Sequence, residues 1–466
     1  MKIKNTLLWA LIGGFLFTSC NKDDNTPDIK DENKINTWIY HVMNDNYLYY
    51  KDMPSTSQLD INLSPSNFFT SLLSRTNEMK YNDNQVGYFY SYIEVPESAT
   101  KADLAKNTYG LDYVIYRLPD NTYLVRVLYV LPNSSADQAG IRRGDYISQV
   151  NNEKLSASNI NKLRSGGAVS LIKAYYDADK NGFVEDKTNP VAMSASSTMY
   201  ENPVYLSKVI ETQGKKIGYL MYNAFRTGPT GFEDKSYDRE LIQKITSLKA
   251  DAVDEMILDL RYNGGGYLTS AVTLGSLLCP QSALSELFAI TRMNDKQESS
   301  NSERNKFFHS KDSIGASNLD LKRLYIIAGS QTASASELII NCLRPYMDVI
   351  HVGSRTEGKN VGSLEYTSTN FPGYILHPIT SKIFNKDLQS DYRNGFVPDS
   401  KNLYDEFDKP EVSMYPLGDI NDPYVQLALK DMGLNTSDQP VTRSVRSLNL
   451  RMLKREPVSD CSGIRL

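Results

Sequence analysis

Short apolar runs alternate with helical segments between residues 203 and 352, and this pattern constrains the fold most. The runs span residues 217–222, 256–260, 324–327 and 349–352. Each has the length of a buried strand, and residues 337–347 form a clear helical segment between two of them. Strands that alternate with helices build α/β domains, whose loops at the strand ends carry function. We therefore predict an α/β domain over residues 201–430.

The chain is long enough for several domains and is nearly neutral. It has 466 residues, of which 40% are hydrophobic, so it can bury more than one core. Its 51 lysines and arginines against 55 aspartates and glutamates give a net charge of −4. This balance provides no strong positive field, and no base-reading motif occurs in the sequence, so nucleic acid is excluded as a partner. The oligomeric state stays open.

The spacing of cysteines and histidines excludes the common zinc sites. The four cysteines never stand in a CxxC pair, and the four histidines never stand at the spacing of a helical zinc protease. Cys279 and Cys342 lie in apolar runs, so we predict buried free thiols there. No metal or organic cofactor is expected.

The amino terminus has the pattern of an export signal. Residues 1–19 contain a basic start, an apolar run at 7–17 and two small residues before Cys20. The run is shorter than the roughly 20 residues that cross a membrane. It resembles a bacterial lipoprotein box, although Phe17 replaces the usual leucine. We predict a lipid anchor at Cys20; an ordinary signal peptide with an incidental cysteine is the alternative.

Residues 20–34 would then form a polar linker. Their Lys-Asp-Asp sequence resembles the surface-export tag of Bacteroidetes lipoproteins. This resemblance implies an outer-membrane lipoprotein of the bacterial cell envelope that faces the periplasm or the exterior.

Aromatic residues at helical spacing mark residues 35–106 as a small helical domain. Aromatic side chains in this pattern are more often core than ligand site. Residues 88–95 read as a strand.

Residues 107–200 change to short strands and turns, and resemble a PDZ domain. The sequence Gly-Ile-Arg-Arg-Gly-Asp at 140–145 is the most recognisable piece. By the same resemblance, Tyr109, Gly110 and Leu111 would present backbone N–H groups to a peptide C-terminus, and the peptide would add as a strand to the sheet edge. A generic β-turn before a strand is the alternative.

One loop in this region partly matches a calcium-binding loop. Asp177, Asp179 and Asn181 alternate before Gly182, but Thr188 stands where a bidentate glutamate is required. A hairpin turn rich in Asp, Asn and Gly explains the same sequence. Both interpretations stay open.

Two junctions between a strand and a helix carry candidate chemistry. After the strand at 256–260, Gly264, Gly265 and Gly266 let the backbone approach a ligand closely, and their N–H groups can form one side of an oxyanion hole. A phosphate-binding loop is excluded because Tyr267-Leu268 follows instead of Lys-Ser or Lys-Thr.

The second junction, at residues 329–337, places Ser334 at a helix start. Ser334 and Glu337 fit a capping box. A serine there also lies at the positive end of the helix dipole, which favours its alkoxide. Lys359 follows the next strand, so one βαβ unit can bring both residues to the same sheet end. Lysine has an ordinary pKa of about 10.4, so Lys359 must be desolvated before it can accept the serine proton.

These motifs together resemble the carboxy-terminal processing, or tail-specific, serine peptidases. The nucleophile of that family is the middle serine of a Ser/Thr-Ala-Ser-Ala-Ser-Glu run, here Ser334. Its base is a lysine in a Gly-x-x-Thr-x-Gly-Lys run, here Lys359. The resemblance covers roughly residues 36–430 and includes the segments at 259–266 and 394–399.

The resemblance implies a Ser–Lys dyad and a crotonase- or ClpP-like α/β (ββα) peptidase domain. It also implies an oxyanion hole formed by the N–H of Ala335 and one N–H from Gly264 or Gly265. The expected substrates are peptides or unfolded proteins that are recognised at their C-termini.

One position departs from the family. Many members carry glutamine four residues after the lysine, where this chain has Ser363. A serine hydroxyl could still support the lysine, with a shorter reach. Ser363 therefore favours the alternative of a non-catalytic surface lipoprotein that captures peptides. A scaffold that recruits partners through the amino-terminal helices is a third interpretation.

The predicted fold is thus multidomain α/β. Its last part, residues 431–466, is expected to be a C-terminal tail. Between residues 440 and 466 it carries six lysines and arginines against two acids. A solvated tail is the preferred interpretation, with a small partner-binding segment or attraction to an anionic surface as alternatives.

Overall fold

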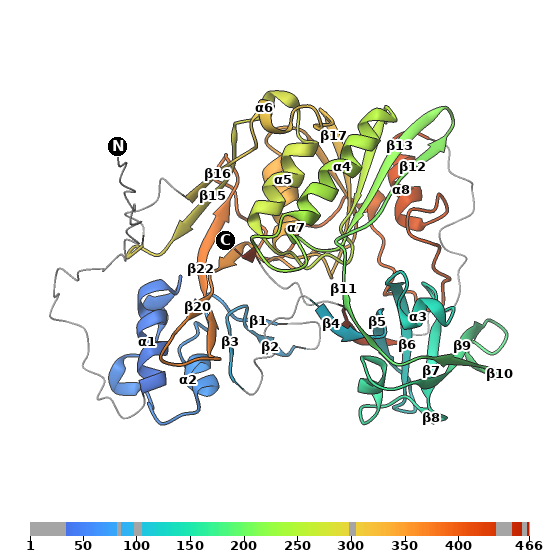
Figure 1. Cartoon of the computed structure of the whole chain (residues 1–466), viewed down its shortest axis with the longest axis horizontal. Helices are drawn as coiled ribbons and strands as arrows, with labels where there is room; N and C mark the ends of the chain where they lie inside the picture. The colour runs from blue at the N-terminus through green and yellow to red at the C-terminus, as the bar shows by residue number, and fades with distance from the viewer. Residues whose placement is uncertain are drawn as a thin grey trace, which may run out of the picture.

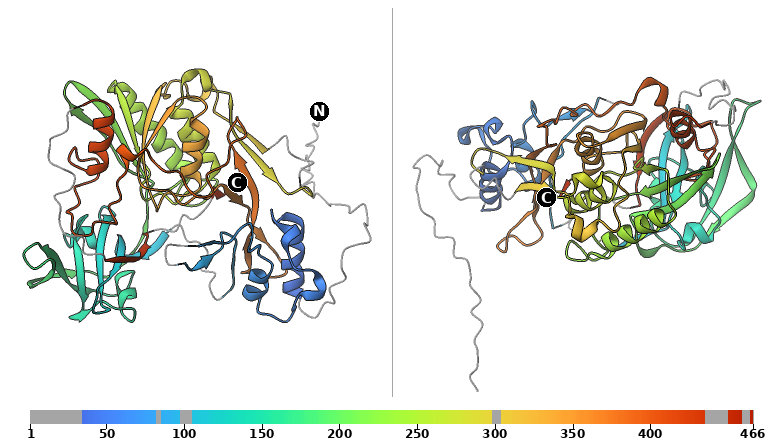
Figure 2. Two further views of the ribbon diagram at one scale, coloured as in Figure 1. Left: turned by 180° about the vertical axis from the view of Figure 1, so that it is seen from behind. Right: turned by 90° about the horizontal axis from the view of Figure 1, so that it is seen from above.

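The computed structural model describes residues 34–81, 85–96, 105–297, 304–434, 450–458 and 464–465. A helical amino-terminal unit and a PDZ-like unit lie at opposite sides of a larger α/β unit, both toward the lower part of the view in Figure 1 (Figures 1 and 2). The predicted multidomain fold is confirmed. The residues predicted to form the signal, lipid anchor and linker lie outside the described residues. No helix within the described ranges is long and apolar enough to cross a membrane.

The amino-terminal unit packs short helices and strands around aromatic side chains. Its elements are α1 (Lys34–Asn46), η1 (Tyr50–Asp52), η2 (Thr56–Gln58), α2 (Pro65–Ser71), β1 (Lys80–Tyr81), β2 (Gly87–Tyr88) and β3 (Tyr92–Glu94). The prediction of one continuous strand over residues 88–95 is wrong, because the extended segment is interrupted between β2 and β3. There the backbone N–H of Ser91 donates to the buried carboxylate of Glu78 rather than to a neighbouring strand.

The PDZ-like unit is an antiparallel sheet capped by short helices. Its elements are β4 (Ala105–Thr108), β5 (Leu111–Arg117), β6 (Tyr123–Val130), α3 (Ser135–Gln138), β7 (Tyr146–Val150), β8 (Glu153–Lys154), η3 (Ile160–Leu163), β9 (Val169–Asp177), β10 (Gly182–Met193) and β11 (Ser197–Tyr200). Neighbouring strands follow the order β10-β9-β7-β6-β5.

The α/β unit is built on a five-stranded sheet in the order β12-β13-β14-β17-β18. Its strands and helices are β12 (Val204–Thr212), β13 (Lys215–Tyr222), α4 (Ser236–Ala250), β14 (Glu255–Asp259), α5 (Leu268–Leu278), β17 (Arg323–Ala328), α7 (Ala335–Leu343) and β18 (Asp348–Gly353). Strands β13, β14, β17 and β18 pair in parallel, as predicted. The predicted helix over 337–347 begins two residues earlier and ends at Leu343.

Side chains on the two faces of this sheet are buried in two different cores. In β17, Leu324 and Ile326 contact the cluster formed with α4, α5 and α7, whereas Tyr325 and Ile327 contact the cluster formed with α8 (Pro423–Asp431). This two-residue period is that of a strand buried on both faces. The burial fixes the register of the strands that carry the candidate site.

A second sheet joins the amino-terminal unit to the α/β unit. Its order is β16-β15-β22-β19-β24, and a smaller sheet pairs β20-β21-β3. The remaining elements are η4 (Gln281–Ala283), β15 (Leu287–Met293), β16 (Asn305–Phe307), α6 (Lys311–Ile314), β19 (Val361–Ser363), β20 (Tyr366–Thr367), β21 (Ile375–His377), β22 (Ile379–Phe384), η6 (Ser400–Asn402) and β24 (Ile464–Arg465).

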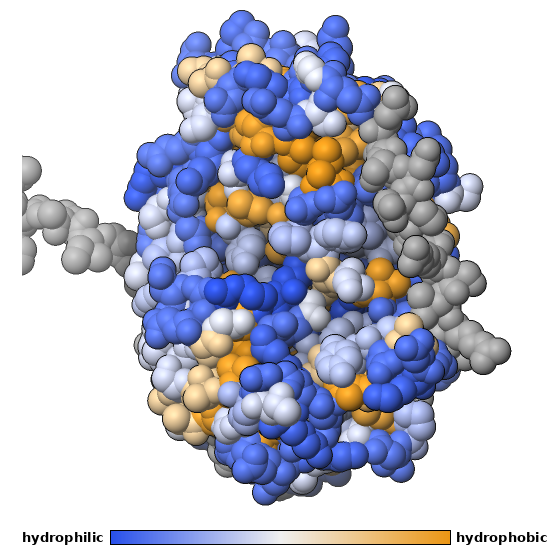
Figure 3. Space-filling model, turned by 90° about the vertical axis from the view of Figure 1, so that its right-hand side faces the viewer, coloured by the Kyte–Doolittle hydropathy of each residue, from blue (hydrophilic) through white to orange (hydrophobic). Residues whose placement is uncertain are grey.

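The described part of the C-terminal tail is not a solvated segment, contrary to the preferred prediction. Strand β23 (Arg451–Glu456) pairs antiparallel with β5 of the PDZ-like unit, and Val458 is buried. The solvated tail was predicted from the charged residues of the segment, whereas its apolar side chains pack against two cores. On the face shown in Figure 3, other apolar side chains gather in patches framed by hydrophilic residues.

Candidate active site

Ser334 lies at the turn that connects β17 to α7, and its backbone is strained. Its φ is 63°, a left-handed value that non-glycine residues adopt at a cost of about 1–3 kcal/mol. The residue is 0% exposed, and its hydroxyl has no hydrogen-bond partner among the described residues. A strained, buried and unengaged hydroxyl at a helix start has the properties of a nucleophile rather than of a purely structural cap.

Glu337 connects the serine turn to the lysine loop. Its Oε2 accepts hydrogen bonds from the backbone N–H of Ser334 at 2.9 Å and of Lys359 at 2.8 Å. The two nitrogens therefore lie within 5.7 Å of each other, the sum of these distances. Its Oε1 accepts from Thr356 Oγ1 and from the N–H of Gly358, both at 2.6 Å. The predicted capping partner thus also fixes the relative position of Ser334 and Lys359.

Burial raises the pKa of Glu337 to about 7, against the lowering effect of its four hydrogen bonds. The folded state therefore binds a proton that the unfolded state releases near pH 4.5, so the stability this group contributes falls as pH rises from about 4.5 to about 7. We expect Glu337→Gln to lose that slope. The stability deficit of the variant should be roughly 2–3 kcal/mol larger at pH 5 than at pH 8. Urea denaturation at both pH values measures it; an equal deficit would contradict the assignment.

Lys359 is buried beside two residues of the amino-terminal unit that the sequence did not indicate. It is 5% exposed, and its Nζ lies 4.7 Å from the centre of the Tyr90 ring. Burial raises the pKa of Glu78, and this rise is opposed by hydrogen bonds from Tyr47 and Ser91 and by the positive charge of Lys359. A cation over an aromatic face and near a buried carboxylate is held in one orientation.

The amino-terminal unit also holds the loop that carries the lysine. Lys80 Nζ donates to the carbonyl oxygens of Glu357 at 2.6 Å and of Arg393 at 2.8 Å. The hydroxyls of Tyr88 and Tyr90 donate to the Glu357 carboxylate. Residues 356–359 are therefore positioned from two sides, by Glu337 and by this unit.

The glycine-rich turn after β14 packs directly against the serine. A Cβ on Gly265, whose φ is 114°, would lie 2.8 Å from Ser334 Cβ, so only glycine fits there. The N–H of Gly265 is engaged by Asn263 Oδ1 at 2.9 Å. By contrast, the N–H groups of Gly264 and Ala335 donate to no other described residue. The sequence left open whether Gly264 or Gly265 contributes to the oxyanion hole, and of the two it is Gly264 that keeps an available N–H donor.

A cleft of about 1050 Å³ opens beside these groups. Its wall is formed by the serine turn, the glycine turn, the lysine loop, the amino-terminal unit and strand β23. Its lining includes Gly264, Ala333, Lys359, Tyr90, Leu453 and Arg455. The cleft is large enough for an extended peptide segment and borders both junctions that the sequence singled out.

Two sets of predicted residues lie outside this cluster. Ser363 is half-buried at the end of β19, four residues beyond Lys359. Tyr109, Gly110 and Leu111 lie in the PDZ-like unit, where the Gly110 N–H donates to Thr108 Oγ1 at 3.0 Å. Cys279 and Cys342 are buried free thiols, as predicted.

The loop with partial calcium character is a hairpin turn between β9 and β10. The Asp177 carboxylate accepts from the N–H groups of Asp179 and Lys180 and pairs with Lys180 Nζ at 3.1 Å. The Asn181 side chain accepts from Tyr176 at 2.8 Å. Within the described residues, no three His, Cys, Asp or Glu side chains gather to hold a metal ion. The structure supports the hairpin interpretation.

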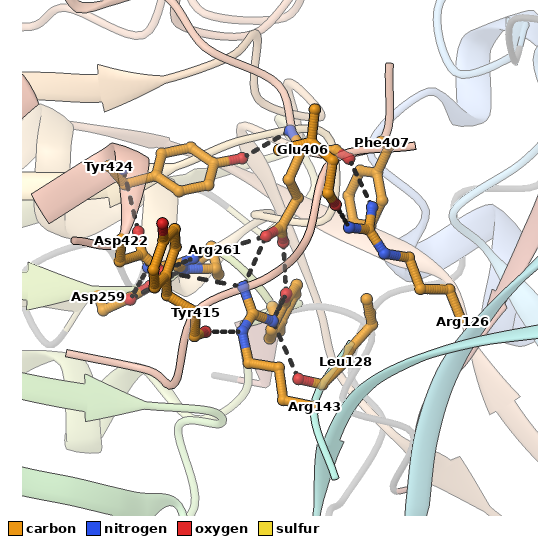
Figure 4. A network of polar contacts seen from close by, with 12 residues as sticks. Arg126, Leu128, Arg143, Asp259, Arg261, Glu406, Phe407, Tyr415, Asp422 and Tyr424 are labelled. Carbon is orange, nitrogen blue, oxygen red and sulfur yellow. Dashed lines mark hydrogen bonds and ion pairs between the residues drawn. The ribbon is translucent and has the colours of Figure 1, made fainter. Parts of the chain in front are cut away.

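A buried charge network leads from the PDZ-like unit to the glycine turn (Figure 4). Arg261 pairs with Asp259 at 2.7 Å and with Asp422 at 3.0 Å. Arg143, from the sequence Gly-Ile-Arg-Arg-Gly-Asp, pairs with Glu406 at 2.7 Å and donates to the Tyr262 hydroxyl at 2.5 Å. The network ends at Tyr262, two residues before Gly264.

Three family models match this chain. Residues 216–401 match the model of peptidase family S41, residues 34–92 match the peptidase S41 N-terminal domain, and residues 126–165 match a PDZ domain. A carboxyl-terminal-processing protease from Picosynechococcus sp. strain PCC 7002 is 26% identical over 51% of this chain and 51% of its own length. The carboxy-terminal processing protease CtpA of Bacillus subtilis strain 168 is 23% identical over 59% and 53%. The chain spans about half the length of these curated relatives.

A crystal structure assigned to the S41 proteases, from Bacteroides fragilis NCTC 9343, is similar over nearly its whole length. It is 30% identical, with a TM-score of 0.73, and the match covers 85% of this chain and 97% of that one. Together with the three matched domains, this similarity shows that the chain belongs to peptidase family S41.

Proposed function

We propose that the protein is a serine endopeptidase that cleaves peptide bonds of unfolded or C-terminally recognised proteins through Ser334 and Lys359. The observation that carries the proposal is the shared Glu337 carboxylate, which binds the N–H groups of both residues while the Ser334 hydroxyl stays unengaged. Family membership supports the same reaction class.

In the proposed reaction, Ser334 Oγ attacks the carbonyl carbon of the scissile bond. Neutral Lys359 accepts the hydroxyl proton, and the N–H groups of Ala335 and Gly264 stabilise the oxyanion. When the tetrahedral intermediate collapses, Lys359 returns the proton to the leaving amine and an acyl-serine remains. Water then attacks the acyl group and gives one proton to Lys359. As the second tetrahedral intermediate collapses, the bond to Ser334 Oγ breaks, Lys359 returns that proton to Ser334 Oγ, and the product acid ionises to the new carboxylate.

Casein hydrolysis tests this function directly. We expect the protein without residues 1–20 to release casein peptides with new termini, detected by mass spectrometry, and EDTA to leave the rate unchanged because no step uses a metal. Casein that binds without product formation would contradict the proposal and indicate the non-catalytic peptide-capturing alternative.

We also propose that a lipid on Cys20 tethers the enzyme to the outer membrane of a bacterial envelope. This rests on the sequence of residues 1–24 alone. Recovery of the full chain in the membrane fraction, and of Cys20→Ala outside it, is the expected result; equal membrane recovery of both forms would contradict it.

A further inference from the structure

The described tail segment lies at the edge of the PDZ-like sheet, where it pairs with β5. β23 pairs antiparallel with β5, and the register sets Arg455 opposite Val114 and Glu456 opposite Tyr113. β5 directly follows Gly110, so the segment adds to the sheet as an extended peptide adds to a PDZ edge. An edge strand offers unpaired N–H and C=O groups to whatever extended segment is nearest.

Side chains of the tail fill the groove between β5 and η3. Leu453 packs against the core cluster that contains Ile160 and Leu163 of η3. Glu456 pairs with Arg164, the residue after η3, at 2.5 Å. The segment therefore packs against the core that η3 shares with β5 and has a charged contact with the residue after η3, as well as backbone pairing with β5.

A buried aspartate recognises one arginine of the segment. Asp112 is 0% exposed, and its two carboxylate oxygens accept from Arg455 Nε at 2.8 Å and Nη2 at 2.7 Å. The Val458 N–H donates to the same carboxylate at 3.2 Å. A bidentate carboxylate fork matches the planar guanidinium group, which lysine cannot imitate.

The same segment reaches the candidate active site. Leu453 and Arg455 line the cleft that Lys359 and Gly264 also line. Arg455 Nη1 donates to the carbonyl oxygen of Tyr262 at 2.8 Å, two residues before Gly264. A peptide in this groove therefore lies along the wall of the cleft.

We infer that residues 450–458 are a resident ligand of the groove between β5 and η3, and that Asp112 makes this groove select peptides that carry an arginine. The segment is connected to α8 through residues 435–449, so it acts as a tethered ligand with an effective concentration on the order of millimolar. Peptides offered in trans must displace it. The role of the groove in substrate choice rests on the proposed peptidase function, whereas the binding itself does not.

Peptide binding tests the inference without any cleavage. The probe is a fluorescent synthetic peptide with the sequence of residues 450–458, and the protein is the full chain with Ser334→Ala. We expect Leu453→Asp, which weakens the resident segment, to increase the affinity for this probe by at least ~10-fold, because the free groove becomes more populated. Fluorescence anisotropy measures the affinity, with Lys430→Ala, a change at an exposed position of α8, as the control.

A probe that carries Arg455→Ala should bind the Leu453→Asp protein at least ~10-fold more weakly than the unmodified probe, because it lacks the partner of Asp112. Any of three results would overturn the inference. The Ser334→Ala protein could bind the probe equally well with and without Leu453→Asp, the two probes could bind the Leu453→Asp protein equally well, or the probe could bind neither protein. With active protein, Leu453→Asp should also lower KM for casein, because substrate no longer competes with the resident segment. Absence of casein cleavage would refute the proposed function only, since the anisotropy result stands apart from it.

Discussion

Ser334→Ala is expected to lower kcat/KM for casein by at least ~1,000-fold, the usual cost of removing a catalytic nucleophile. The unfolding free energy should change by less than about 1 kcal/mol, because the hydroxyl makes no hydrogen bond to a described residue that the alanine would lose. The backbone N–H to Glu337 is retained in the variant. Initial rates of casein hydrolysis, beside urea denaturation, measure both effects.

The matched control is Ser247→Ala, which removes an exposed hydroxyl on α4 and should leave the rate unchanged. Lys359→Ala should reduce the rate by ~100- to 10,000-fold through loss of the general base. Turnover by Ser334→Ala within tenfold of the parent would refute Ser334 as the nucleophile. A pH–rate profile of Lys359→Ala that matches the parent would refute Lys359 as the base.

Local patterns predicted the scaffold of the site because they act over short distances. Apolar runs located β13, β14, β17 and β18, and one βαβ unit placed the Ser334 and Lys359 turns at the same sheet end. Gly265 was indicated by the sequence as a point of close backbone approach to a ligand, and the structure places it against Ser334 with a φ of 114°. These features depend on residues that are neighbours in the chain or on adjacent parallel strands.

Long-range partners of the site were not predictable. Glu78 and Tyr90 lie more than 250 positions before Lys359, in a segment whose aromatic residues are equally typical of a core. The attachment of β23 depends on Arg455 meeting Asp112, 343 positions away. The hydrophobic periodicity of the sequence does not indicate such a pairing, because the pairing forms only when three separate units pack together.

The buried network around Arg261 predicts the largest stability effect. Arg261→Met is expected to lower the free energy of unfolding by about 3–5 kcal/mol, because it leaves the buried Asp259 without its cation and Asp422 with only the more distant Arg143. Casein cleavage should fall as well, since Tyr262 and the glycine turn follow Arg261 directly. Urea denaturation of the variant beside the parent measures the loss.

Lys215→Met is the matched control for Arg261→Met. It removes a cation from an exposed pair with Asp254, 3.2 Å away, and pairs of that kind contribute only about 0–1 kcal/mol. Added salt should weaken the exposed pair and leave the buried network nearly unaffected, since water and ions do not reach Arg261. If Arg261→Met cost no more than Lys215→Met, the network would not be what fixes the end of β14. The glycine turn beside Ser334 would then depend on its backbone hydrogen bonds with Phe225 and on packing against the serine turn.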